Sequence, residues 1–456
     1  MEATKDTSKQ LGEERITKLL IKFSIPGIIG MLVNAFYNVV DRIFVGNGVG
    51  SLGIAAITVA FPVMLLLMAF SMLIGVGAST LVSIRLGQQK KEEAERIIGN
   101  ALVLSASIAI VISATSLIFL EPLLRLCGAS DAVLPYAKDF TTIILLGSIF
   151  QIVSMGMNNF IRAEGNPKIA MYTMLIGALL NCVLNPIFIF GLRLGIRGSA
   201  LATVVSTLVS AAWVMWHFIG GRSTLKIRPE NFRIRLDIAT SIISIGMAPF
   251  AMQLAASLVN IILNTSLKIY GGDIAISGMG IVSSILTLFL MPLFGINQGL
   301  QPIIGYNFGA RKYNRVKQAL KEGIFAGVAI ASLGFIVTRV FPVQLVSLFT
   351  ENDTALIAFG VKAMKINLIL LPIIGFQVVG ANYFQAVGKP IQAALLGLSR
   401  QVLVLIPTLL ILPRFLGITG VLAAGPVSDL IAAIFTVIWL IREMRILSQE
   451  QIAAAK

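Results

Sequence analysis

Charged side chains are scarce in this chain. Lysine, arginine, aspartate and glutamate make up 12% of its 456 residues, whereas they make up about a quarter of a typical soluble domain. Hydrophobic residues make up 57%, and the mean hydropathy is +0.90. This composition excludes a soluble globular protein and predicts an integral membrane protein.

Histidine and cysteine are nearly absent as well. His217 is the only histidine, and Cys127 and Cys182 are the only cysteines. A zinc site and a histidine-based catalytic triad each need more of these residues, and Cys182 lies within an apolar segment, so no disulfide framework is expected. The apolar segments also contain no paired carboxylates and no nucleophile beside a base. We therefore predict that the protein is not an enzyme and holds no metal or cofactor.

Long apolar runs recur along the whole chain. Residues 54–84, 101–120, 171–190 and 277–304 are examples, and each is long enough to cross a membrane, which takes about 20 helical residues. The alternating pattern of a membrane β-barrel is absent, and a continuous apolar run in lipid must satisfy its backbone hydrogen bonds internally. We therefore predict an all-α membrane protein with twelve transmembrane helices.

Basic residues gather in alternate connections between these runs. Lys90 and Lys91 lie in one such connection, and Arg311 and Lys312 lie in another. Because positive loops stay on the cytoplasmic side, we predict that both termini are cytoplasmic. The net charge of +15 then reflects basic loops against an anionic inner leaflet, and no nucleic-acid partner is expected. Residues 1–18 are polar and mixed in charge, which predicts a soluble tail rather than a cleaved signal.

The two halves of the sequence resemble each other at an offset of 222 to 226 residues. Pro26 then falls on Pro249, and Asp41 falls on Asn264. Each half would hold six spans, so both halves keep one orientation and form two pseudo-symmetric six-helix bundles. The predicted parts are an N-terminal tail (1–18), an N-lobe with helices one to six (19–221), a linker (222–237), a C-lobe with helices seven to twelve (238–442) and a C-terminal tail (443–456).

Asp41 is an acid inside the first apolar helix. An ionised carboxylate in a membrane-spanning helix costs roughly 2.5 to 3.5 kcal/mol, so the side chain must be paired, hydrated or protonated. Arg42 is the nearest basic residue in the sequence, but adjacent helical residues point about 100° apart. We therefore predict that Asp41 is a proton or cation site.

Two later helices carry polar residues at helical spacing. Asn181 and Asn185 are four residues apart in the fifth helix, and Ser199 and Thr203 are four apart in the sixth. If these helices meet Asp41, their amide and hydroxyl oxygens complete the kind of site that a hard cation prefers. The alternative is ordinary hydrogen bonding between helices.

Polar residues also share one face of the first helix and one face of the seventh, at spacings of three and four. We predict that both faces look into the bundle, where they either contact substrate or bond to other helices. The candidate cavity residues are Asn34, Tyr37, Asn38, Gln253, Ser257, Asn260, Asn264, Gln377 and Asp429. Asp429 in the twelfth helix is either a second ion site or the partner of Arg400.

Two prolines interrupt the first and seventh helices. Pro26 and Pro249 each remove a backbone hydrogen bond and bend or weaken the helix locally. We therefore expect these two helices to be the parts that move.

Several of these segments resemble one known family. Tyr37-Asn-Val-Val-Asp41-Arg-Ile-Phe-Val-Gly46, Asn181-Cys-Val-Leu-Asn185-Pro186 and Gly198-Ser-Ala-Leu-Ala-Thr203 are similar to the first, fifth and sixth helices of the multidrug and toxic compound extrusion (MATE) transporters. Within that family the chain looks most like the DinF and MepA type. The resemblance implies a secondary antiporter in the cytoplasmic membrane of a prokaryote, which exports organic cations or amphipathic compounds in exchange for H⁺ or Na⁺.

The resemblance also implies where the coupling ion would bind. The matching positions are Asp41, Asn181, Asn185 and Thr203. Asn185 departs from the family pattern, since many relatives have aspartate there, and the loss of one acid favours H⁺ over Na⁺. The NorM type instead has acids on helices seven and ten, and this chain has only amides at those faces, including Gln377.

The resemblance implies small-molecule substrates and a lipid bilayer as partners, with no obligatory protein partner. The alternative function is a flippase for a lipid or a lipid-linked sugar on a related fold. Such a protein needs cations in its cavity, and only Arg42, Lys365 and Arg400 are candidates.

Overall fold

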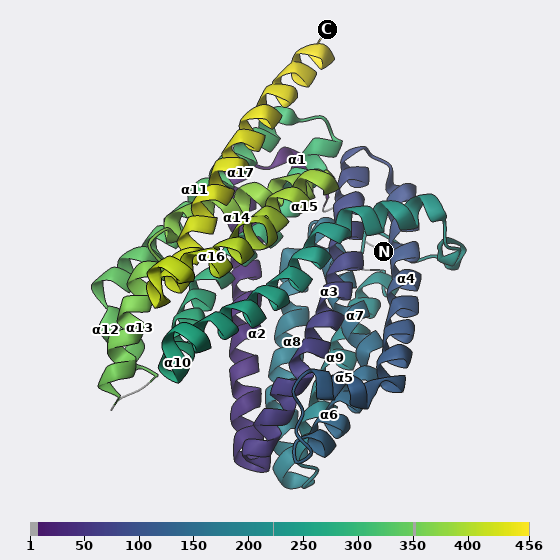
Figure 1. Cartoon of the computed structure of the whole chain (residues 1–456). Helices are drawn as coiled ribbons and strands as arrows, with labels where there is room; N and C mark the ends of the chain where they lie inside the picture. The colour runs from purple at the N-terminus through teal and green to yellow at the C-terminus, as the bar shows by residue number, and fades with distance from the viewer. Residues whose placement is uncertain (1–7, 222, 350–352, 456) are drawn as a thin grey trace. The chain divides into compact units, whose positions relative to one another are not determined.

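The computed structural model describes residues 8–221, 223–349 and 353–455, except for the side chains of residues 38, 39, 51, 273 and 452–455. Over these residues the chain is helical and contains no strand (Figure 1). Ten helices are long and apolar enough to cross a membrane, and two bent helix pairs raise the number to twelve. The predicted all-α transmembrane fold is confirmed.

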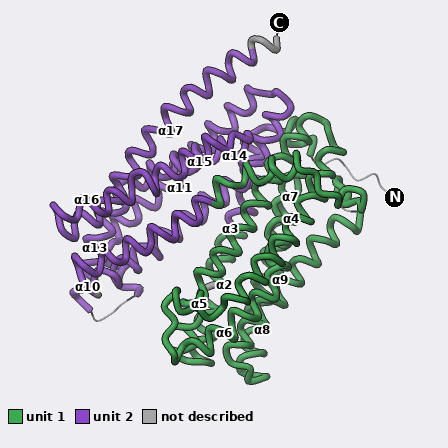
Figure 2. Tube along the Cα trace, turned by 45° about the vertical axis from the view of Figure 1, so that its right-hand side comes forward, with its two compact units in different colours: residues 1–13, 29–250 green, residues 14–28, 251–456 purple. Residues whose placement is uncertain are grey.

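The chain forms two compact units (Figure 2). The first unit comprises the chain up to residue 13 and residues 29–250, and the second comprises residues 14–28 and the chain from residue 251 onward. The chain therefore passes from one unit to the other within α2 (Ile16–Val49) and within α10 (Leu236–Gly309). The borders of these units differ from the predicted lobes at the same two helices, since the start of each helix belongs to the other unit.

The first unit is a bundle built around α3. Besides parts of α2 and α10, this unit contains α1 (Gln10–Glu13), α3 (Ser51–Gly87), α4 (Lys91–Ile118), α5 (Leu120–Leu126), α6 (Leu134–Leu146), α7 (Ser148–Ala163), α8 (Pro167–Pro186), the π-helix η1 (Ile187–Gly191), α9 (Ile196–Ile219) and the 3₁₀-helix η2 (Pro229–Phe232). Helix α3 packs on α4, α6 and α7, and α9 packs on α6, α7 and α8. Gly75 lets α3 approach α7 closely, because a Cβ there would lie 2.8 Å from the Cα of Gly156.

The second unit repeats this order of elements. It contains α11 (Tyr313–Val340), α12 (Pro342–Ser347), α13 (Thr354–Asn367), α14 (Leu371–Ala386), α15 (Pro390–Leu398), the π-helix η3 (Ser399–Leu405), α16 (Ile406–Leu416) and α17 (Ile418–Ala455). Helix α10 breaks at Gly272, where φ is 66° and ψ is −160°, so it forms two spans. Helix α17 continues without interruption through most of the predicted tail at 443–456.

One span in each half is bent at its middle. Helices α6 and α7 meet at 52°, and α13 and α14 meet at 51°. The first bend falls at Gly147, where a Cβ would lie 2.4 Å from the side chain of Val204. The near-equal angles show that the repeat seen in the sequence is also a repeat in three dimensions.

Glycines at equivalent positions of the two halves lie against α2 and α10, the two helices within which the chain passes from one unit to the other. In the first unit a Cβ on Gly77 would lie 2.2 Å from the carbonyl oxygen of Ile242, which lies in the first part of α10. In the second unit a Cβ on Gly299 would lie 2.8 Å from the carbonyl carbon of Phe23, which lies in the first part of α2. Only glycine permits such backbone approach, and this explains why both positions of the repeat are glycine.

Candidate functional site

Asp41 lies in the last third of α2, in the first unit, and its side chain is half-buried. Its Oδ1 atom accepts two hydrogen bonds, one from Asn185 Nδ2 at 2.7 Å and one from Ser199 Oγ at 3.1 Å. Among the residues that the structure describes, no ion pair involves Asp41, and Arg42 does not contact the carboxylate. The acid is therefore held by neutral donors only.

The hydrogen bonds continue from Asp41 across α8 and α9. Asn185 Nδ2 also donates to Asn181 Oδ1 at 2.7 Å, and Asn181 Nδ2 donates to Thr203 Oγ1 at 3.1 Å. Asn181, Asn185 and Ser199 are at most 2% exposed, whereas Thr203 is half-buried. The structure thus brings together all four residues that the resemblance named, and we call this set with Ser199 the Asp41 cluster.

The local backbone explains why α8 and α9 meet at this point. Helix α8 ends at Pro186, directly after Asn185, and a π-helical turn follows. Proline has no N–H to continue the α-helical bonding, and single π-turns are frequent at functional sites. At the start of α9, a Cβ on Gly198 would lie 2.8 Å from the carbonyl group of Phe188. This close contact places the adjacent Ser199 beside the end of α8.

One buried oxygen in the Asp41 cluster has no partner among the described residues. Asn185 Oδ1 is buried, and within the described part of the chain it accepts no hydrogen bond. Buried polar atoms in native proteins are nearly always satisfied by protein, water or an ion. A carboxylate, an unsatisfied amide oxygen and two hydroxyl groups form a set of ligands suited to a hard cation. The same geometry accommodates a protonated acid, because both hydrogen bonds to Asp41 use one oxygen and leave Oδ2 for the proton.

The second unit contains a different buried acid. Asp429 in α17 is 2% exposed and forms an ion pair with Arg400 Nε in η3. Of the two alternatives that the sequence left open for Asp429, the geometry realises the pair with Arg400. The carboxylate is thereby compensated by a permanent positive charge.

The other predicted cavity residues of α2 are less enclosed than Asp41. Asn34 is exposed and Tyr37 is half-buried. The side chain of Asn38 lies outside the described residues. These positions belong to the first unit.

The predicted residues of α10 belong to the second unit. Gln253 and Ser257 are half-buried, and Asn260 and Asn264 are exposed. Ser257 Oγ and Asn260 Nδ2 donate to carbonyl oxygens of their own helix, at 3.4 Å and 2.9 Å. Gln377 in α14 is 4% exposed, and its Oε1 accepts no hydrogen bond from the described residues. A role for any of them in substrate binding stays a prediction.

One buried cluster was not anticipated from the sequence. His217 at the end of α9 bonds through Nε2 to Glu164, and the Ser223 hydroxyl donates to the other oxygen of the same carboxylate. All three are at most 3% exposed. Glu164 thus joins the connection between α7 and α8 to the segment that leaves α9. The lone histidine was the signal in the sequence, but its partner could be found only in three dimensions.

A family model described as MatE matches the chain twice, at residues 26–187 and at residues 249–410. The "Multidrug export protein MepA" of Staphylococcus haemolyticus is 28% identical over 433 residues, which cover 95% of each chain. Two similar solved structures are described as crystal structures of MATE, one "in the bent conformation" with a TM-score of 0.93 and one "in the straight conformation" with a TM-score of 0.92. Each is 26% identical and covers 98% of this chain and 100% of its own.

Proposed function

Because the chain belongs to the MatE family, we propose that it is a secondary antiporter that exports organic cations or other amphipathic compounds in exchange for H⁺ or Na⁺. The similarity to a multidrug export protein over nearly the whole chain supports drug-like substrates. The relatives described as export proteins and transporters support a transporter rather than an enzyme, and the apolar helices support a membrane protein. The substrates are thus small molecules.

The observation that carries the coupling proposal is the environment of Asp41. The carboxylate is bonded by Asn185 and Ser199 but has no cationic partner among the described residues. Neutral donors lower the energy of a charged acid only in part, and an unpaired charge inside a membrane protein is costly. The charge is therefore available to an exchangeable H⁺ or Na⁺, and the unsatisfied oxygen of Asn185 supplies a further ligand for Na⁺.

The same charge provides a reason for exchange. With Asp41 ionised, the Asp41 cluster favours a cationic substrate in the pathway, because opposite charges attract in a medium of low dielectric constant. Binding of H⁺ or Na⁺ from outside neutralises the acid and weakens that attraction. Substrate and coupling ion then compete for the same charge, and each leaves the protein when the other binds.

Two prolines lie beside the points where the chain changes units. Pro26 precedes the border at residues 28 and 29, and Pro249 precedes the border at residues 250 and 251. Proline removes one helical hydrogen bond and permits a bend. Similar MATE structures are described as bent and as straight, and we assign such a change of shape to α2 and α10 because of these prolines.

The charges of the loops support a prediction of how the protein is oriented in the membrane. We place both termini on the cytoplasmic side of the cytoplasmic membrane of a prokaryote, because the basic connections gather on that side. Labelling of single cysteines from either side of oriented vesicles tests this placement.

The test is transport of a fluorescent organic cation in proteoliposomes. A pH gradient and a Na⁺ gradient are imposed separately, for the natural protein and for Asp41→Asn. We expect one gradient to drive transport, and we expect Asp41→Asn to reduce that transport to the background rate because the amide cannot exchange H⁺ or compensate a cation. Asp131→Asn is the matched control, since Asp131 is exposed and carries the same charge.

The outcomes separate the alternatives. Transport driven by the pH gradient alone assigns H⁺ as the coupling ion, and transport driven by Na⁺ alone assigns Na⁺. Full transport by Asp41→Asn would refute the role of Asp41. If neither gradient drives transport while a labelled lipid moves between leaflets, the lipid flippase replaces the antiporter. The charge of Arg400, one of the few cations such a flippase could use, is already compensated by Asp429.

A further inference from the structure

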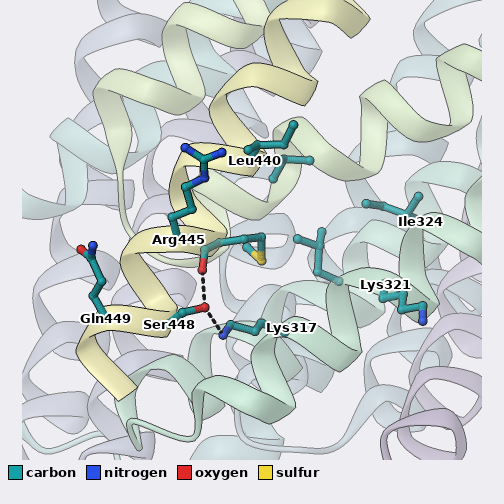
Figure 3. Close-up of a pocket in the computed structure, with 10 residues that line it drawn as sticks. Lys317, Lys321, Ile324, Leu440, Arg445, Ser448 and Gln449 are labelled. Atoms are coloured by element: carbon teal, nitrogen blue, oxygen red, sulfur yellow. Dashed lines mark hydrogen bonds between the residues drawn. The ribbon is translucent and has the colours of Figure 1, made fainter. Parts of the chain in front are cut away.

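A groove lies between α11 and the last turns of α17, both in the second unit (Figure 3). Its volume is about 700 Å³. Three of the side chains that line it are cationic, Lys317, Lys321 and Arg445, and none is acidic. Within the described part of the chain, Lys321 and Arg445 form no ion pair.

The groove changes from polar to apolar along its length. At one end Lys317 Nζ donates to Ser448 Oγ at 2.8 Å, which fixes the register of the two helices (Figure 3). Ile324 lies seven residues further along α11, about 10 Å from Lys317 at 1.5 Å per residue. Leu440 lies a similar distance back along α17, so the other end of the groove is apolar. Because both helices are membrane spans, the apolar end lies at membrane depth and the polar end at the surface.

The acids nearest in sequence to Lys321 and Arg445, Glu322 and Glu443, do not line the groove. Glu322 in α11 accepts a hydrogen bond from Gln318 at 2.8 Å. Glu443 in α17 is 4% exposed and is bound by Lys389 Nζ at 2.6 and 2.7 Å. The positive charge of the groove is therefore available to a ligand.

In the first unit, the position equivalent to this groove is occupied by the segment that follows α9. An offset of 222 residues places Lys321 on Gly99 in α4. A Cβ on Gly99 would lie 2.5 Å from the carbonyl oxygen of Asn231, because the segment that follows α9 packs directly on α4. Leu225 in that segment is fully buried. In the second half, α17 continues straight instead of turning back, and the groove stays open.

The shape and charge of the groove specify its occupant. We propose that it binds an anionic glycerophospholipid from the inner leaflet, with the phosphate group at the cationic side chains of the groove and an acyl chain along Ile324 and Ile441. Ammonium and guanidinium groups are strong donors to phosphate oxygens, and basic pockets between transmembrane helices on the cytoplasmic side bind anionic head groups. A soluble anion would leave the apolar end uncovered, and a zwitterionic lipid would bring no net charge to the cations.

The test uses the purified full chain and two lipids, phosphatidylglycerol and phosphatidylcholine. Native mass spectrometry counts the bound lipids, and thermal unfolding measures the stabilisation that each lipid gives. The test variant is Lys321→Gln with Arg445→Gln. The matched control is Arg311→Gln with Arg442→Gln, which removes the same charge from exposed positions of the same region that do not line the groove.

We expect phosphatidylglycerol to bind in preference to phosphatidylcholine. The affinity should fall about fivefold for each charge removed in the test variant, since one such cation contributes about 1 kcal/mol. The control, and a variant with Lys321→Arg and Arg445→Lys, should keep the preference. Equal loss in test and control, no preference between the lipids, or the same stabilisation by inorganic phosphate would each overturn the proposal. None of these results depends on drug transport, so the lipid site and the proposed function can fail separately.

Discussion

Each unit contains an acid within a membrane-spanning helix, half-buried Asp41 in the first and buried Asp429 in the second, and the two acids have different kinds of partner. Asp41 in the first unit is bonded by the neutral groups of Asn185 and Ser199. Asp429 in the second unit is bonded by the guanidinium of Arg400. Both acids lie near a π-helical segment, since Asn185 precedes η1 and Arg400 is part of η3. The same fold thus offers two solutions to the cost of a carboxylate in a membrane protein.

The charge of the bonding partner indicates which of the two acids is suited to exchange an ion. Arginine stays charged under all ordinary conditions, so the pair of Arg400 and Asp429 is neutral as a unit and has little need of an external cation. The amide and hydroxyl groups that bond Asp41 bring no net charge, so no ion pair fixes this carboxylate among the described residues. We infer that the Arg400–Asp429 pair is a fixed neutral unit and that the proposed exchange of an ion belongs to the Asp41 cluster.

The largest expected effect comes from breaking the ion pair in the second unit. Asp429→Asn leaves the Arg400 charge without its partner, and removal of one member of a buried pair costs roughly 3 kcal/mol or more. We expect a cost near the lower end of that range, because the Arg400 side chain is 28% exposed. Thermal unfolding of the purified protein in detergent measures the loss.

A double substitution shows whether the lost pair is responsible. Arg400→Gln together with Asp429→Asn removes both charges, and it should recover most of the stability because no buried charge remains. If the double variant is destabilised as much as the single one, the unpaired charge of Arg400 is not the cause of the loss, and the contrast with Asp41 loses its basis.

The two units also differ at the ends of their last helices. In the first unit Asn100 holds the segment that follows α9, since its Oδ1 accepts from the Arg235 N–H at 2.7 Å and its Nδ2 donates to the carbonyl of Asn231 at 3.2 Å. Glu95 accepts from the Lys226 N–H at 3.1 Å. The second unit has a straight helix and an open groove at the equivalent place. The linker is therefore bound along α4 rather than free.

The second prediction loosens this linker. Asn100→Ala removes the bonds of Asn100 to the Arg235 N–H and to the Asn231 carbonyl, and each such bond contributes about 0.5 to 1.5 kcal/mol. Hydrogen exchange of residues 223–235 should become at least about fivefold faster, as expected for a loss of 1 kcal/mol. Asn314→Ala, at an exposed position of α11, should leave the rates unchanged. Unchanged exchange in Asn100→Ala would mean that Asn100 does not hold the segment.

Local patterns were sufficient to predict much of the fold and of the site. The apolar runs predicted the spans, and the spacing of four between Asn181 and Asn185 placed both on one face of α8. The same spacing placed Ser199 and Thr203 on one face of α9. That these two faces meet Asp41 was an open alternative from the residues alone, and it was implied by the resemblance to the MATE family.

Other features depend on packing that no local pattern records. The start of α2 belongs to the second unit and the start of α10 to the first, because Gly299 and Gly77 leave room for them. The bend at Gly147 and the pairing of Glu164 with His217 likewise depend on residues far apart in sequence. A helical period shows which face of a helix is polar, but it does not show which distant side chain that face meets.

The last prediction makes the Asp41 cluster more like a cation site. Asn185→Asp puts a second carboxylate next to Asp41, at the position where Asn185 Nδ2 now donates at 2.7 Å. Two adjacent carboxylates repel each other and bind a cation more tightly, so we expect Na⁺ affinity to rise about tenfold, or about 1.4 kcal/mol. The measurement is thermal unfolding in NaCl against KCl at constant ionic strength. Asp41→Asn in the same background should remove the Na⁺ effect, and an equal effect without Asp41 would place the ion elsewhere.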